Sequence, residues 1–435
     1  MFTVINATIL VILAFAIYGL VKGWDVRLVL FAAALALASL ALKPWIVLDM
    51  FLSTMGDGKI VGPICSAVGY AFVLKLIGAD QEMVRLLITP LRRRLWLLIP
   101  GGCAVGFVTN MAITSQMAAA ATVGLVLIPL MLAAGYHPFI AAATLVLGCS
   151  AGGNLFNPGD PDIVAIVNNT AVNGGTADAV LHAMIVPELL GFVAATVAFW
   201  LLSRWFPPDG SGKPTEEAAS DDRRIDLSKA LLPLLPVVML FVTLPGLGLL
   251  PWLLKYYADG LPVPHAMVIS TIVAMLVSRA NAAAQTKAFF EGMGFGYVHV
   301  ISVIIVATCF IEAMKAVGLV QELVSLIQSS GPLGKLAAGF FPWLLAVVSG
   351  SGVAPSVAFS NAVLPEVSAG NLAGAIDLGV IGSIGATFGR TMSPVAAVVI
   401  FAATLTNVPP LQIVRRTAPA LAVGALVVLA VVLAR

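Results

Sequence analysis

Charged residues are scarce in this sequence: they make up 10% of its 435 residues, whereas ordinary soluble domains carry about 25%. The chain is instead 60% hydrophobic, with a mean hydropathy of +1.04. Together these figures exclude an ordinary soluble globular protein and indicate one that crosses a membrane several times.

Cysteine and histidine are also rare, with four of each. The cysteines lie in apolar segments and show no CxxC spacing, which argues against a zinc or redox site and predicts buried apolar thiols. The histidines lie near the ends of apolar segments, where we expect contact with water.

Motifs for nucleotides, nucleic acids and hydrolysis are missing as well. The GSG at 350–352 follows no strand, so it is not a dinucleotide fingerprint. The basic run Arg92–Arg94 flanks an apolar segment and indicates membrane topology rather than nucleic-acid binding. An intramembrane hydrolase needs a nucleophile with a base, or two aspartates on facing helices, and the sequence offers neither pattern. We therefore expect a protein that is not an enzyme and that draws its energy from an ion gradient.

Apolar segments recur along the whole chain, and several approach the ~20 residues that cross a bilayer as a helix. Examples are 4–20, 26–42, 184–202, 231–249 and 418–433. The first has no Ala-x-Ala-like cleavage site after it, so we interpret it as a retained helix. The sequence thus predicts an all-α polytopic membrane protein.

The two halves of the chain repeat one another. A shift of 240 residues lays KLIGADQEMVRL, which begins at Lys75, over KAVGLVQELVSL, which begins at Lys315, and six of twelve positions are identical. Between the halves lies a stretch rich in proline, glycine and charge. We therefore predict a first repeat over 1–204, a cytoplasmic linker over 205–229 and a second repeat over 230–435.

Each repeat carries polar residues where a membrane helix should be. They are Thr109–Gln116 within the apolar region 95–135, and Ser349–Ser356 within 333–370. Polar groups at membrane depth must line a cavity or be buried in protein. We predict a re-entrant hairpin over each region, with the polar residues at its tip.

A second interruption follows each hairpin. Gly148–Asp162 interrupts a helix expected over 138–171, and Gly385–Pro394 interrupts one expected over 375–406. Glycine and proline prevent a continuous helix, and the backbone groups that a break frees suit a cation on one side and an anion on the other. Two breaks at matching places in two halves indicate the binding site of a transporter.

Charge distribution predicts the orientation. Each repeat has five crossing helices, one of them broken, so the second repeat must be inverted relative to the first. With the amino terminus outside, sixteen lysines and arginines fall on the inner side and six on the outer, as the positive-inside rule favours. We expect both termini outside a bacterial-type cytoplasmic membrane.

The tips and breaks together resemble a known family. GNLFNPGDPD, GRTMSP and SGSGVAPSVAFSNAVLPEVSAG are similar to the DcuC-type anaerobic carriers of four-carbon dicarboxylates, in the ion-transporter superfamily that also holds citrate and succinate carriers. Better-studied relatives carry Ser-Asn-Thr at each tip and Thr-Pro-Pro at each break, where this sequence has TNMAITSQ, SGSGVAPS, NPGDP and MSP. The resemblance covers nearly the whole chain and implies a homodimer in which a transport domain moves against a scaffold domain.

Three acidic residues and one arginine can each be interpreted in two ways. Arg390 is costly at membrane depth unless it is paired or functional, so it either binds a substrate carboxylate through its guanidinium fork or forms an ion pair with Asp160, Asp162 or Glu312. For Glu312, a local pair with Lys315 is the simpler account. The two aspartates are either cation or proton ligands or caps of the half-helix that follows them.

The expected site combines both tips and both breaks. Expected substrate-binding residues are Thr114, Ser115, Asn157, Ser349, Ser351, Ser356, Arg390, Thr391 and Ser393. Expected cation-binding residues are Thr109, Asn110, Gly152, Asn154, Asp160, Gly350 and Thr387. No cofactor is expected beyond sodium ions. For the serines, close helix packing is the alternative role.

These observations predict a secondary active transporter of a small organic anion, in the first place a four-carbon dicarboxylate of the succinate, fumarate or malate type. A sodium or proton gradient would drive it through elevator-type alternating access. Two alternatives stay open. A cation/proton antiporter would explain the aspartates but not Arg390, and a carrier of another carboxylate, such as gluconate, would share the same architecture.

Overall fold

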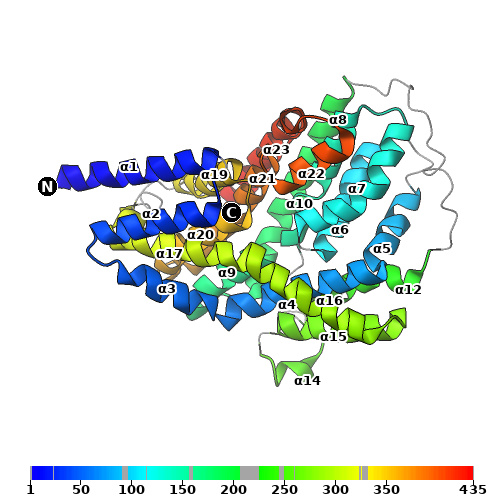
Figure 1. The fold of residues 1–435 in the computed structure, drawn as a ribbon, viewed down its shortest axis with the longest axis horizontal. Coiled ribbons are helices and arrows are strands. Elements are labelled where there is room, and N and C mark those ends of the chain that lie inside the picture. Colours follow the sequence, from blue (N-terminus) through cyan, green and yellow to red (C-terminus); the bar gives the residue numbers. More distant parts are fainter. Residues whose placement is uncertain are drawn as a thin grey trace.

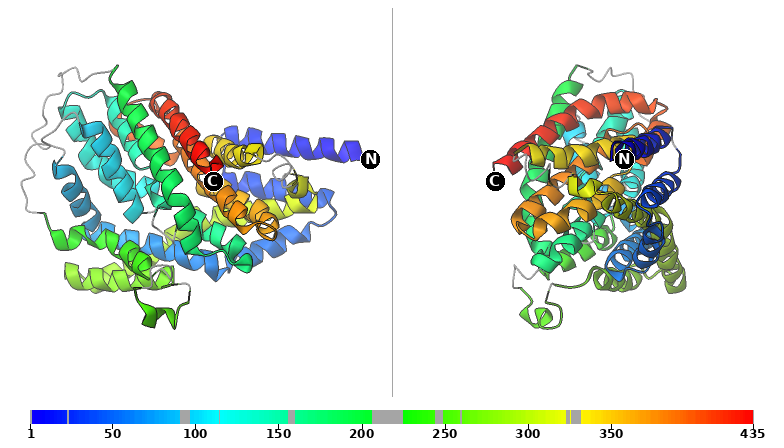
Figure 2. Two further views of the ribbon diagram at one scale, coloured as in Figure 1. Left: turned by 180° about the vertical axis from the view of Figure 1, so that it is seen from behind. Right: turned by 90° about the vertical axis from the view of Figure 1, so that its left-hand side faces the viewer.

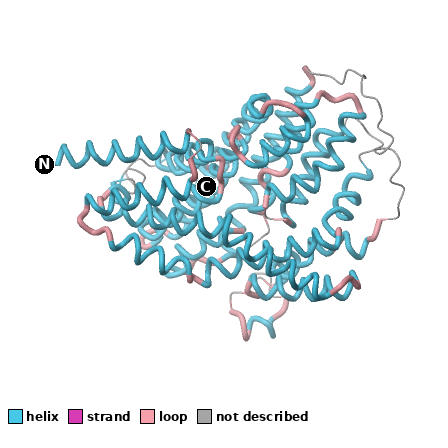
Figure 3. Tube along the Cα trace, in the orientation of Figure 1, coloured by secondary structure: helices cyan, strands magenta, loops and turns pink. Residues whose placement is uncertain are grey.

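The computed structural model is built of helices and connecting loops (Figure 1, Figure 3). It describes residues 2–22, 24–90, 97–113, 115–155, 160–205, 225–243, 249–258, 260–322, 325 and 332–434, and no strand is present in these ranges. Two predicted site residues, Thr114 and Asn157, lie outside the described residues. So does most of the predicted linker, at 206–224.

The helices of the first half precede the linker. They are α1 (Phe2–Val21), α2 (Val26–Leu40), α3 (Trp45–Met55), α4 (Gly58–Ile77), α5 (Ala79–Ile88), α6 (Leu98–Ala112), α7 (Gln116–Ala133), α8 (Pro138–Gly148), η3 (Gly152–Asn154), α9 (Pro161–Thr170), η4 (Ala171–Asn173) and α10 (Ala177–Ser203). Helices α6 and α7 form the first hairpin, and α8 and α9 are the two halves of the first broken helix.

The helices of the second half follow in a similar order. They are α12 (Leu227–Ala230), η5 (Leu232–Leu234), α13 (Leu235–Val242), α14 (Pro251–Leu254), α15 (Val263–Ser278), α16 (Ala282–Gly296), η7 (Tyr297–Ile301), α17 (Ser302–Ala316), α19 (Pro332–Ser349), α20 (Val353–Ser368), α21 (Leu372–Thr391), α22 (Ala397–Thr406) and α23 (Pro410–Leu433). Helices α19 and α20 form the second hairpin, and α21 and α22 form the second broken helix.

Six helical segments of the described part are long and apolar enough to cross a bilayer. They are Ile60–Ile77, Gln116–Ala133, Ala177–Ser203, Ala282–Ala316, Leu372–Thr391 and Pro410–Leu433. The longest of them is the continuous run of α16, η7 and α17. The expectation of five crossings per repeat, with the second repeat inverted, stays a prediction.

Helix bounds follow the repeat seen in the sequence. Helix α22 lies 236 positions after α9 at both of its ends, Pro161–Thr170 against Ala397–Thr406. The 240-residue shift lays the turn between α3 and α4, at Gly56 and Asp57, over Gly296 and Tyr297, where η7 begins. The first half therefore turns at a place where the second half continues through a π-helical segment.

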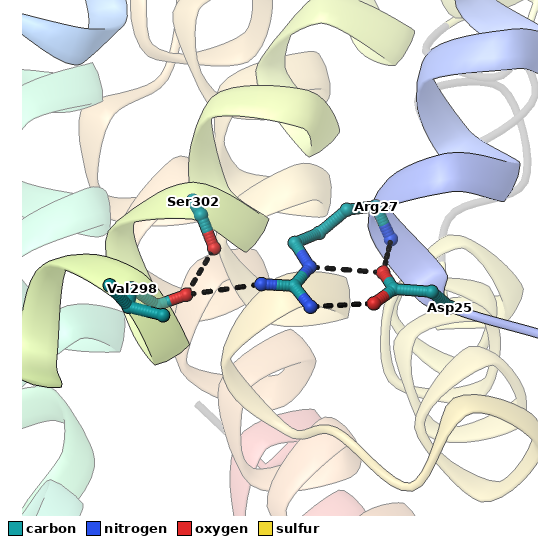
Figure 4. Close-up of polar contacts among 4 residues, drawn as sticks. All are labelled: Asp25, Arg27, Val298 and Ser302. Carbon is teal, nitrogen blue, oxygen red and sulfur yellow. Dashed lines mark hydrogen bonds and ion pairs between the residues drawn. The ribbon is translucent and has the colours of Figure 1, made fainter.

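The π-helical segment η7 is tied to the start of α2 (Figure 4). The Ser302 N–H donates to the Tyr297 carbonyl five residues earlier, which frees the Val298 carbonyl from the usual ladder. That carbonyl accepts hydrogen bonds from Arg27 Nη1 at 3.3 Å and from the Ser302 hydroxyl at 2.5 Å.

The same arginine holds the amino-terminal cap of α2. The Arg27 guanidinium forms two bonds to the Asp25 carboxylate, and the Asp25 side chain also accepts from the Arg27 backbone N–H at 2.8 Å. Hydrogen bonding to Arg27 lowers the pKa of Asp25 to about 2. Both side chains are more than 40% exposed, so this pair orients α2 but adds at most about 1 kcal/mol to stability.

The apolar interior is divided into separate cores. The largest joins the hairpins, the broken helices, α10 and α23. A second joins α2, α3, α4 and α17, and a third joins α4 with α15 and α16. Helix α1 extends from the body of the protein, away from the largest core (Figure 1, Figure 2). The hairpins and broken helices therefore share the largest core, while Ala165 of α9 and Val357 of α20 also join the core of α4 and α17.

The prediction for the second break was partly wrong. Gly385–Thr391 was expected to interrupt the helix, but α21 continues to Thr391 and the break covers 392–396. The glycines serve close packing instead. A Cβ at Gly385 would lie 2.4 Å from the Gly339 carbonyl oxygen of α19, and one at Gly389 would lie 2.3 Å from that of Trp343. Arg390 is thus held on a regular helix rather than in a loop.

Candidate substrate and cation site

The two hairpin tips and the two breaks meet at one cavity of about 280 Å³. The first half contributes Asn110, Ser115, Gln116, Met117, Gly153, Asn154, Asp160, Pro161 and Asp162, and the second contributes Gly350, Ser351, Gly352, Val353, Arg390, Ala396, Ala397 and Val398. The opposite wall comes from Ile64, Ala67 and Val68 of α4 and from His299 and Val300 of η7. The cavity therefore lies between the largest core and the helices of the other two.

Four helix amino termini reach this cavity, and they fall into two kinds. Those of α7 and α9 are capped by their own side chains: Ser115 accepts from the Ala118 N–H at 3.3 Å, and Asp160 from the Asp162 N–H at 3.0 Å. Those of α20 and α22, which begin after Gly352 and Ala396, have no side-chain cap. Uncapped N–H groups at a helix start attract anions, so these two starts form a part of the cavity wall that suits an anion.

Arg390 lies beside these uncapped termini. Its Nη2 donates to the Ser150 carbonyl oxygen in the first break at 3.1 Å, and its guanidinium packs on Gly352, 3.3 Å from where a Cβ would stand. No described carboxylate lies within the 4.0 Å of an ion pair with it, and its Nε is buried with no acceptor among the described residues. The arginine fork is therefore available to an anion that enters the cavity.

The second tip needs glycine to make its turn. Gly350 has a φ of +70°, a left-handed conformation that L side chains rarely adopt. A Cβ there would also lie 3.1 Å from the backbone of Ala396, at the start of α22. The tip is held by the Ser349 hydroxyl, which accepts from the Ser351 N–H at 3.3 Å. These contacts set the starts of α20 and α22 side by side.

The first tip is tied to the first break by Asn110. Its Oδ1 accepts from the Gly153 N–H at 2.9 Å, and its Nδ2 donates to the Ile113 carbonyl oxygen at 3.1 Å. Gly152 packs directly on α6, since a Cβ there would lie 2.0 Å from the Phe107 carbonyl oxygen. The first tip and the first break therefore behave as one packed unit.

A buried polar network continues from the first break into α21. Asn154 Nδ2 donates to the Ser383 hydroxyl at 3.0 Å and to the Thr387 hydroxyl at 3.1 Å. Ser383 in turn donates to Asp162 Oδ2 at 3.0 Å, while Asp162 Oδ1 has no partner among the described residues. Oxygen atoms of this kind suit a proton or a hard cation.

Both alternatives for the aspartates receive structural support. Asp160 is the amino-terminal cap of α9, as one interpretation expected. It also lines the cavity with Asp162, and both act electrostatically on Arg390 without forming an ion pair with it. Glu312 instead lies 3.6 Å from Lys315, which confirms the predicted local pair.

The predicted site residues divide into two groups. Those that line the cavity are Asn110, Ser115, Asn154, Asp160, Gly350, Ser351 and Arg390. Those that lie outside its lining are Thr109, Gly152, Ser349, Ser356, Thr387, Thr391 and Ser393. Thr391 is linked to the lining, because its hydroxyl accepts from Gln116 Nε2 at 3.3 Å. The assigned roles of all these residues stay predictions.

Sequence reasoning missed two residues near the cavity. Glu188 of α10 is fully buried and acts electrostatically on the aspartates and Arg390. Its signal was an acid in the middle of an apolar helix of 27 residues. His299 was placed at a segment end, but it lies in the middle of the α16–η7–α17 run and lines the cavity. The four cysteines are buried free thiols, as predicted.

Comparison with known proteins identifies relatives of the chain. Residues 47–435 match the family model described as DcuC, C4-dicarboxylate anaerobic carrier. The chain is 22% identical over 392 residues to the anaerobic C4-dicarboxylate transporter DcuC of Escherichia coli, covering 87% of this chain and 81% of that protein. It is 35% identical over 203 residues to an uncharacterized transporter of Haemophilus influenzae, covering 46% of this chain and 71% of the relative.

Two solved structures share the fold. MtrF of Neisseria gonorrhoeae, described as representing a class of antimetabolite efflux pumps, aligns with a TM-score of 0.60 at 14% identity, covering 89% of this chain and 82% of that one. The YdaH transporter of Alcanivorax borkumensis aligns with a TM-score of 0.57 at 15% identity, covering 89% and 86%. At this identity the likeness establishes an all-helical, multi-pass membrane fold.

Proposed function

The chain belongs to the DcuC family of C4-dicarboxylate anaerobic carriers, and from this premise we propose that it is a secondary active transporter of a small organic anion, in the first place a four-carbon dicarboxylate. It is a membrane transporter and not an enzyme. We also propose a coupling ion, a moving domain and the residues that contact the substrate.

Arg390 is the observation that carries this proposal. It lines the cavity, has no carboxylate partner among the described residues and lies beside the uncapped starts of α20 and α22. Positive charge and free N–H groups on one wall favour an anion at that wall. A cation/proton antiporter would leave this arrangement without a use.

The opposite wall supports an elevator-type mechanism. Most buried apolar residues of the hairpins and broken helices lie in the largest core, whereas those of α4 and η7, which close the cavity, lie in the other two; Ala165 of α9 and Val357 of α20 are the contacts of the first group with the α4 and η7 side. We infer that the first group is the transport domain and that it moves past α4, α16 and α17 as the scaffold. The family resemblance adds a homodimer and a sodium or proton gradient as the driving force.

Uptake into proteoliposomes tests the function. Purified protein should take up labelled succinate or fumarate saturably, in preference to lactate and gluconate, and a sodium or proton gradient should drive the uptake. Preference for gluconate would assign another carboxylate. Cation-dependent proton movement with no carboxylate uptake would favour the antiporter and contradict the proposal.

Replacing Asn154 by leucine should change ion dependence more than substrate affinity. The side chain lines the cavity and anchors the network that ends at Asp162, so its loss removes polar groups that can bind the coupling ion. We expect the sodium or pH dependence of uptake to shift while the KM for succinate changes less than threefold.

Asn173→Leu is the matched control, because this exposed asparagine of η4 bonds only to Ser368 among the described residues. It should retain wild-type ion dependence. An Asn154→Leu protein with unchanged sodium and pH dependence would contradict a role of the Asn154 network in binding the coupling ion.

A further inference from the structure

Glu188 is a buried acid whose carboxyl group has no hydrogen-bond partner among the described residues. It lies in the middle of α10 with 0% exposure. An ionised carboxylate in that state would carry a desolvation cost that proteins avoid by keeping the group neutral. The transport site described above makes no use of this residue.

The groups that act electrostatically on Glu188 can be named element by element. Helix α9 and its cap bring Asp162 and Asp160, and α21 brings Arg390. Helices α6 and α8, which also pack on α10, contain no charged residue. The only charged residues of helix α23 are Arg415 and Arg416. They lie about 12 Å along the helix from Gly424, the residue that packs on Gly191 of α10 near Glu188.

The charges in this cluster do not balance. Three acids share one guanidinium, and Arg390 can offset only one of them. Hydrogen bonds stabilise the negative charge of the other two acids. Asp160 accepts a bond from a backbone N–H at the start of α9, and Asp162 accepts one from the Ser383 hydroxyl. Glu188 has neither kind of donor, so it is the carboxyl least able to hold a negative charge.

Substrate entry makes the imbalance worse. In the proposed function, a dicarboxylate brings two more negative charges and engages Arg390, the one base among the described residues that acts on the cluster. A proton bound to a carboxyl of the cluster would remove one of these negative charges.

We propose that Glu188 is the proton-binding residue of this carrier. A proton from water binds one Oε atom when substrate occupies the cavity and returns to water after substrate leaves, with no other bond made or broken. This inference rests on the proposed function and deepens it, because it names the coupling ion and its site. Glu188 acts on Arg390 and does not itself line the cavity, so it is a positioning and coupling residue.

Glu188→Gln tests the proposal, because glutamine mimics the protonated side chain. Three assays are run on wild type and variant in proteoliposomes or detergent: exchange of internal for external succinate at equal pH, net succinate uptake driven by an imposed pH gradient, and proton uptake from weakly buffered solution when succinate is added. Glu188→Gln should retain exchange within threefold of wild type, lose pH-driven uptake at least tenfold and lose the succinate-induced proton uptake.

Retained exchange shows that the variant is folded, so a coupling defect is separated from a structural one. Asp178→Asn, on the first turn of the same helix and paired with His182 at 3.3 Å, is the matched control and should behave as wild type in all three assays. If Glu188→Gln is not recovered folded, Glu188→Asp keeps the acid on a shorter side chain and should shift the pH profile of exchange; an unchanged profile would overturn the proposal.

The same assays distinguish failure of the proposed transport function from failure of the proposed role of Glu188. Absence of succinate, fumarate and malate exchange by wild-type protein would contradict the proposed function. Wild-type exchange together with undiminished pH-driven uptake by Glu188→Gln would leave that function standing and overturn the role of Glu188. Wild-type uptake that follows a sodium gradient and ignores the pH gradient would overturn it as well.

Discussion

Arg390→Ala should abolish transport while the protein remains folded. Within the described residues the side chain donates a single hydrogen bond, to the Ser150 carbonyl oxygen, and forms no ion pair, so few native contacts are lost with it. A substrate carboxylate in the cavity would lose its charged donor. Removing one partner of a buried, hydrogen-bonded charge pair costs about 2–5 kcal/mol, which corresponds to a loss of about 30-fold or more in affinity.

The lysine variant separates charge from geometry. Lysine keeps the positive charge but offers a point donor in place of a planar fork, so Arg390→Lys should recover only part of the binding. A purely structural arginine predicts something else: poor folding or insertion of Arg390→Ala, because three acids would be left without their base.

Succinate binding to purified, folded protein in detergent decides between these accounts. Wild-type affinity of Arg390→Ala for succinate would contradict a role of Arg390 in substrate binding. Arg204→Ala provides the control, since this exposed arginine at the end of α10 stacks on Trp200 at 4.5 Å, far in sequence from both tips. It should bind and transport as wild type does.

Gly152→Ala should disrupt the first break and with it transport. The added Cβ would stand 2.0 Å from the Phe107 carbonyl oxygen and 3.0 Å from the Met111 nitrogen, both in the α6 backbone. That backbone has little room to retreat, because the Phe107 ring packs on Phe192 with centroids 4.3 Å apart. Overpacking commonly costs about 1–3 kcal/mol, and a clash with backbone belongs at or above the upper end.

The expected result is a melting temperature below wild type and at least a tenfold loss of succinate transport. The displaced break would lose the bond from the Gly153 N–H to Asn110, which lines the cavity. Gly294→Ala is the matched control, because a Cβ there meets nothing within 4 Å and alanine is favoured by about 1 kcal/mol inside a helix. Equal melting temperatures and equal transport for the two variants would show that the close packing at Gly152 is unimportant.

The sequence predicted the site where polar and helix-breaking residues interrupt apolar segments. Such interruptions stand out against their surroundings, which is why the tips near Asn110 and Ser351 and the break before Asp160 were found. Bounds in the second break were less predictable. Gly385 and Gly389 suggest a loop in isolation, and only the neighbouring α19 backbone shows that they serve packing within a helix.

Glu188 and His299 show why the remaining residues near the cavity could not be predicted from the sequence. Glu188 has no counterpart in the repeat, since a shift of 236 residues lays it over Gly424, and one acid in an apolar helix carries no motif. His299 reaches the cavity only because η7 replaces an ordinary turn, and hydrophobic periodicity does not reveal a π-helical segment. Both depend on which helices become neighbours in three dimensions.

The π-helical segment η7 also changes the phase of the long rod formed by α16 and α17. A π turn holds about one residue more than an α turn, so the two helices share an axis direction but are out of step by about 100°. Helix α16 can therefore face α4, while α17 faces α2 and α3. One continuous helical run thus packs on two different sets of neighbours, and the change of phase falls at η7, which closes the cavity opposite the hairpin tips.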